Sequence, residues 1–135
     1  MLPILVLAYF GAAAGLPVAI RRWGARAVWI GLIPSATAAA ALIAAAGGVI
    51  GGDPLTTRID WVPSLGIGLD LSLDAAALTM GLVVTVVGGA IFSYAIGYSG
   101  APGKLVTRLN LFAGAMFGLV LSDNLFGLFV FWELT

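Results

Sequence analysis

Cysteine and histidine are absent from this sequence of 135 residues, and only 9% of its residues are charged. The two absences exclude disulfides, Cys or His nucleophiles, and metal or haem sites that depend on thiolate or imidazole ligands. Six basic and six acidic residues give a formal net charge of zero, which does not favour a nucleic-acid partner. The sequence therefore predicts no cofactor, no bound metal and no nucleic acid.

What the sequence has in excess is apolar residues. They make up 61% of the chain, and the mean hydropathy is +1.13. Soluble domains are typically about 45–50% apolar and about 25% charged. The composition indicates an integral membrane protein whose main surroundings are a lipid bilayer.

Uncharged runs divide the chain into helices, because a helix rising about 1.5 Å per residue needs about 20 apolar residues to cross a core of about 30 Å. Four complete transmembrane helices and the start of a fifth are predicted, over residues 1–20, 27–50, 75–98, 105–122 and 124–135. Pro34 predicts a kink in the second helix. Residues 124–135 make only about 18 Å of helix, too little to cross, so the fifth helix and the chain are interpreted as truncated. The predicted fold class is an all-α integral membrane bundle.

The segment of residues 53–74 is the only long polar stretch. Apolar residues alternate with others along it, which predicts a β-hairpin between the second and third helices. The alternating residues are Thr57, Ile59 and Trp61 and then Leu65, Ile67, Leu69, Leu71 and Leu73. Four carboxylates lie here, Asp53, Asp60, Asp70 and Asp74. Their spacing follows no ligand pattern, so a solvated face is favoured over a cation site.

The basic residues predict an orientation, because Lys and Arg are enriched in cytoplasmic loops. Five of the six lie in the loop after the first helix or around the start of the fourth: Arg21, Arg22, Arg26, Lys104 and Arg108. Only Arg58 lies in the hairpin. We therefore expect a multi-pass protein of the cell's inner (plasma) membrane with an extracytoplasmic N-terminus and hairpin.

Glu133 is the one carboxylate within an apolar helical run. If the fifth helix begins at Asp123, Glu133 lies about 15 Å along it, near the middle of the bilayer. An ionised carboxylate there costs about 2.5–3.5 kcal/mol, so the residue is a candidate for proton translocation. The alternative is a structural polar group reached by Arg108, about 7 Å away in depth. For Asp123 and Asn124, a turn and helix cap are favoured over an ion ligand, and a place at the outer mouth of a pathway stays open.

Three stretches carry a family resemblance: "WVPSLGIGLDLSLD", "VVTVVGGAIFSYAIGY" and "LNLFAGAMFGLVLSDNLFGLFVFWELT". They resemble the N-terminal part of the A-type subunit of the Mrp-type multisubunit sodium/proton antiporter. That subunit is related to the large antiporter-like subunit of respiratory complex I, and the ending "WELT" favours the antiporter branch.

The resemblance implies that residues 1–135 form the single N-terminal transmembrane region of a larger secondary ion transporter subunit, not an enzyme. It implies other antiporter-complex subunits as partners, with protons and monovalent cations, sodium foremost, as the transported ions. In the family, the glutamate that corresponds to Glu133 is thought to pair with a lysine on a later helix, and this sequence stops before such a helix. Ser93 stands near where many complex I relatives carry a histidine.

Two alternatives stay open. The chain is the same region of a proton-pumping NADH dehydrogenase subunit, or it is a small structural membrane subunit that packs against larger ones. Glycine pairs at helical spacing, Gly11 with Gly15 and Gly114 with Gly118, are interpreted as ordinary helix packing and not as a dimer site.

Overall fold

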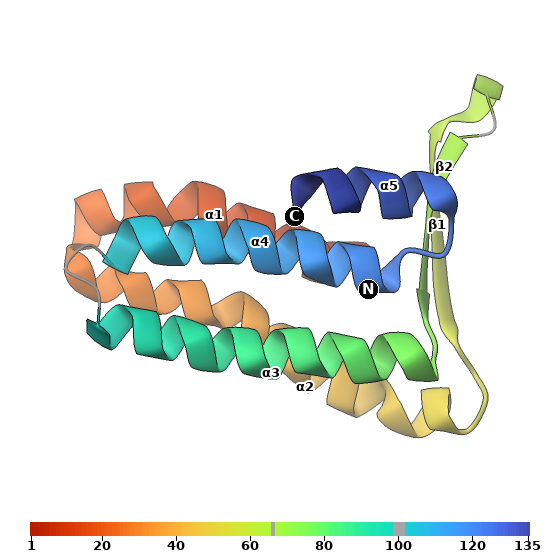
Figure 1. The fold of residues 1–135 in the computed structure, drawn as a ribbon, viewed down its shortest axis with the longest axis horizontal. Helices are drawn as coiled ribbons and strands as arrows, with labels where there is room; N and C mark the ends of the chain where they lie inside the picture. Colours follow the sequence, from red (N-terminus) through yellow and green to blue (C-terminus); the bar gives the residue numbers. More distant parts are fainter. Residues whose placement is uncertain (66, 99–101) are drawn as a thin grey trace.

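A computed structural model describes residues 1–65, 67–98 and 102–135. Its long helices lie side by side, and a β-hairpin crosses one end of them (Figure 1). The elements in chain order are α1 (Leu2–Trp23), η1 (Ala25–Leu32), α2 (Ile33–Ile50), β1 (Leu55–Val62), η2 (Pro63–Leu65), β2 (Ile67–Leu73), α3 (Ala75–Tyr98), α4 (Pro102–Leu121) and α5 (Leu125–Leu134). Four helical segments of the described chain are long and apolar enough to cross a membrane: α1, η1 with α2, α3, and α4. The predicted helical membrane fold with a hairpin between the second and third helices is confirmed.

Local chemistry sets the helix ends. The first helix ends at Gly24, whose φ of 77° favours glycine and whose N–H donates to the Ile20 carbonyl over 2.9 Å. The third helix begins after Asp74, whose Oδ1 accepts from the Ala77 N–H over 2.7 Å. Asp74 is therefore an N-cap and not a free loop carboxylate.

The second membrane segment differs from the single kinked helix that the sequence predicts. It starts as a 3₁₀ helix, η1, and becomes α-helical only at Ile33. Pro34 has no N–H to donate to the carbonyl of Ile30 four residues earlier, and the Ile33 N–H bonds to that carbonyl instead. The proline thus marks the junction of two helix types.

The hairpin covers the end of the bundle with one face of β2. The strands pair antiparallel from Leu55 opposite Leu73, with an irregularity between Asp60 and Val62. Leu71 and Leu73 are buried, as expected from their alternation, and join the main hydrophobic cluster of the helices. β1 stays largely exposed.

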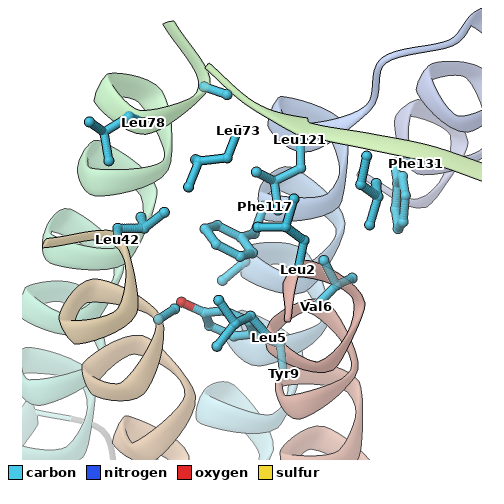
Figure 2. Packing of buried hydrophobic residues seen from close by; sticks show 14 of the residues in the cluster. Leu2, Leu5, Val6, Tyr9, Leu42, Leu73, Leu78, Phe117, Leu121 and Phe131 are labelled. Carbon is cyan, nitrogen blue, oxygen red and sulfur yellow. The ribbon is translucent and has the colours of Figure 1, made fainter. Parts of the chain in front are cut away.

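The main core lies at the hairpin end of the bundle. Phe117 and Tyr9 pack there with ring centroids 5.9 Å apart, and leucines from α1, α2, β2 and α4 surround them (Figure 2). α4 lies against both α1 and α3, and α5 folds back along α4 (Figure 1). This arrangement places the start of α5 beside the hairpin.

Candidate functional site

The turn from α4 to α5 is fastened to the hairpin by Asn124. Its Oδ1 accepts from the Gly127 N–H over 2.7 Å and so caps α5. Its Nδ2 donates to the Gly68 carbonyl over 2.7 Å and to Asp70 Oδ2 over 2.8 Å. The Asp123 N–H donates to the Asp70 carbonyl over 2.8 Å. One amide side chain therefore fixes where the helix that carries Glu133 begins.

Two hairpin carboxylates are held by one guanidinium. Arg58 Nε donates to Asp60 Oδ1 over 2.9 Å, and its Nη1 donates to Asp70 Oδ2 over 3.3 Å. The hydrogen bond with Asp60, followed by the charge of Asp70, raises the pKa of Arg58. Asp70 thus links the exposed ion pairs to Asn124.

Asp123 faces a different setting from its neighbour. Its side chain is exposed and lines a cavity of about 220 Å³ where α3, α4 and the hairpin meet. Asp74 lines the same cavity but is engaged in capping α3. Of the two residues predicted to form a turn or a pathway mouth, Asn124 therefore has a structural role, and Asp123 is an exposed carboxylate.

Glu133 lies on the exposed side of α5, in the last turn of that helix. Two residues earlier, Phe131 is buried, and its ring packs directly against Gly118 of α4. A Cβ on Gly118 would lie 2.5 Å from two carbons of that ring. This contact sets the position of α5 along α4 and with it the depth of Glu133.

The ion pair of Arg108 with Glu133, which was the alternative interpretation of that carboxylate, is not formed. The salt bridges found among the described residues belong to Arg58. Because Phe131 packs on Gly118, ten residues beyond Arg108, the arginine and the carboxylate are separated by about 12 Å along the helix axis, not about 7 Å. Arg108 instead lines a cavity between α1 and α4 at the opposite end from the hairpin.

Several buried polar groups within the helices were missed by reasoning from the sequence. Tyr9 donates a hydrogen bond to Ser35 Oγ over 3.2 Å inside the bundle. Asn110 is fully buried, and its Nδ2 donates to the Val106 carbonyl, while its Oδ1 has no partner among the described groups. Ser93 of α3, in contrast, is exposed, and its hydroxyl donates to the Gly89 carbonyl over 2.9 Å. The signal in the sequence that could have revealed the buried groups was a single polar residue inside an apolar run.

Known proteins resemble this chain in both sequence and fold. A chain in the structure of an Mrp complex from Dietzia sp. DQ12-45-1b matches with a TM-score of 0.79 and 31% identity, over 98% of this chain and 14% of that one. The Na(+)/H(+) antiporter subunits A1 of Staphylococcus haemolyticus (strain JCSC1435) and Staphylococcus aureus (strain JH9) are 41% and 40% identical over 87 residues. The resemblance to the A-type subunit of the Mrp-type antiporter is confirmed.

The extent of these matches is uneven. The aligned stretch covers 62% of this chain but only 11% of each staphylococcal relative. Residues 60–98, from the hairpin through α3, match the family model described as the N-terminus of NADH-ubiquinone oxidoreductase (complex I) chain 5. With four described helical segments long and apolar enough to cross a membrane, the chain is a multi-pass membrane protein related to both groups.

Proposed function

We propose that this chain forms part of the ion-translocating membrane subunit of a multisubunit monovalent cation/proton antiporter, with Glu133 as a carboxylate on the proton path. The observation that carries the proposal is the match of nearly the whole chain to a chain of an Mrp complex. The two staphylococcal relatives, which are sodium/proton antiporter subunits, support sodium as the exchanged cation. Other subunits of such a complex are the partners.

The position of Glu133 supports its role. It lies eight residues after the first residue of α5, or about 12 Å from the hairpin end of the helix. A bilayer core is about 30 Å thick, so the carboxylate lies near the middle if the hairpin marks one membrane surface. A titratable group there needs a paired charge, a proton or water, and exchange between these conditions is what a proton path requires.

The orientation is also proposed. Five of the six basic residues lie toward the end of the bundle opposite the hairpin, which favours the cytoplasmic side of the plasma membrane for that end. Met1 and the hairpin then lie on the extracytoplasmic side. The second candidate function is the corresponding region of a proton-pumping complex I subunit, which the family match of residues 60–98 favours.

Glu133→Gln tests the role of the carboxylate, because glutamine keeps the size and polarity of the side chain but does not titrate. We expect sodium-driven proton movement in membrane vesicles to fall by the order of a hundredfold, the contribution typical of a positioned proton-transfer group. Asp53→Asn is the matched control, since it neutralises an exposed carboxylate in the loop before the hairpin. Transport by Glu133→Gln equal to that of the control, with normal assembly, would remove Glu133 from the path.

A further inference from the structure

The cavity at the basic end of the bundle has the form of a headgroup site. It has a volume of about 510 Å³ and lies between α1, η1 and α4. From α1 it is lined by Pro17, Ile20 and Arg21, which follow an i, i+3, i+4 spacing and so share one helix face. These three residues form the α1 wall of the cavity, which faces α4.

The opposite wall of the cavity is formed by the first two turns of α4. Lys104 and Arg108 are four residues apart and lie on one face, with Thr107 between them in the lining. The Thr107 hydroxyl donates to the Gly103 carbonyl over 2.8 Å. Three cationic side chains from two helices therefore surround one cavity, next to the positive end of the α4 dipole.

Nothing anionic in the described chain neutralises these three cations. The described salt bridges all belong to Arg58, at the other end of the molecule. The acidic residues lie in α5, in the hairpin, or in the loops beside it: Asp53, Asp60, Asp70, Asp74, Asp123 and Glu133. Within the described residues, these three cations therefore have no carboxylate partner.

The rest of the lining shows what kind of anion fits. Ile20, Val28, Pro17 and Ala25 add apolar surface to the lining beside the charged groups. The lining residues lie at the end of α1 and the start of α4, which Figure 1 shows at the end of the bundle opposite the hairpin. Ends of membrane-spanning helices are where headgroups are met. A phosphate joined to acyl chains matches this change from charged to apolar, whereas a free anion matches only the charged part.

We propose that this cavity binds the phosphate headgroup of an anionic phospholipid, held by Arg21, Lys104 and Arg108. Its acyl chains lie along the apolar surface of the lining. The site does not involve Glu133, so the test of lipid binding is independent of the test of the proton path.

The test measures lipid affinity of the protein purified in mild detergent and stripped of lipid. Short-chain phosphatidylglycerol, phosphatidylcholine and inorganic phosphate are added separately, and binding is followed by native mass spectrometry and thermal midpoint. Wild-type protein should bind phosphatidylglycerol in preference to the other two. Arg21→Gln/Lys104→Gln should weaken that binding about tenfold or more, since each basic group near a lipid surface contributes severalfold.

The control is Arg22→Gln/Arg26→Gln, which removes two charges from the same end of the bundle but from residues outside the lining. It should retain wild-type affinity, and the conservative Arg21→Lys/Lys104→Arg should retain most of it. If the control variant lost as much affinity for phosphatidylglycerol as Arg21→Gln/Lys104→Gln, the protein would be attracted to anionic lipid in general. If inorganic phosphate bound as well as phosphatidylglycerol, the cavity would be an anion site that does not recognise lipid. Either result would overturn the proposal, as would lipid binding that survives in Arg21→Gln/Lys104→Gln.

Discussion

Replacing Gly118 with alanine is the sharpest probe of how α5 is held. The new Cβ would lie 2.5 Å from Phe131 Cδ1 and Cζ, well inside the ordinary contact distance of at least about 3.4 Å. The ring or the whole helix has to move by about 1 Å, and overpacking of this kind costs about 1–3 kcal/mol. We therefore expect Gly118→Ala to lower the stability of the folded bundle.

A second glycine supplies the control, because alanine also improves helix propensity by about 1 kcal/mol. Gly11 lies on an open face of α1, and a Cβ there would meet nothing within 4 Å. Gly11→Ala therefore reports the propensity gain alone. The difference between the two variants isolates the clash at Phe131 and should equal about 1–3 kcal/mol.

The assay is thermal unfolding of the purified protein in detergent, with the two alanine variants measured beside the parent. Adding Phe131→Ala removes the ring, so Gly118→Ala in that background should behave like Gly11→Ala. Equal midpoints for Gly118→Ala and Gly11→Ala in the parent would refute the reasoning. In that case Phe131 would not set the position of α5, and the depth inferred for Glu133 would lose its support.

Two further outcomes are expected. Asn124→Ala should destabilise the protein by about 1–2 kcal/mol in the same unfolding assay, because it removes the cap of α5 and the two hydrogen bonds to the hairpin. A loss of stability no larger than that caused by Ser122→Ala would contradict this prediction. The chain lacks native cysteine, so single cysteines report sidedness directly: Ser64→Cys should react with an impermeant maleimide on intact cells and Arg26→Cys should not. Reaction with the opposite sidedness would reverse the proposed orientation.

Patterns along the chain predicted those elements whose causes are local. The third helix was expected over residues 75–98 from its long uncharged run, and α3 spans Ala75–Tyr98. Its cap, Asp74, was expected only as a solvated loop carboxylate. The hairpin followed from alternating leucines, since a period of two places Leu71 and Leu73 on one face. The 3₁₀ start of the second segment was missed, although Pro34 was the signal for it.

Contacts between distant segments could not be predicted in the same way. The bond from Asn124 to Asp70 joins residues 54 apart, and no local pattern records it. The alternative pairing of Arg108 with Glu133 is not formed, because the register of α5 on α4 cannot be counted from the turn at Asp123 alone. The register of α5 on α4 depends on one aromatic ring meeting one glycine, Phe131 on Gly118.

The two ends of the bundle differ in whether their charged side chains find partners within the chain. At the hairpin end, Arg58 and Asn124 hold Asp70 within the chain, while Asp53 and Asp123 are exposed. At the other end, the described cations have no carboxylate within the chain and depend on their surroundings. Only Glu133 lies between these ends, and the contact of α5 with α4 keeps it away from the cations. This distribution of charge favours one orientation in the membrane, is the basis of the proposed anion-binding cavity, and leaves Glu133 as the carboxylate proposed for the proton path.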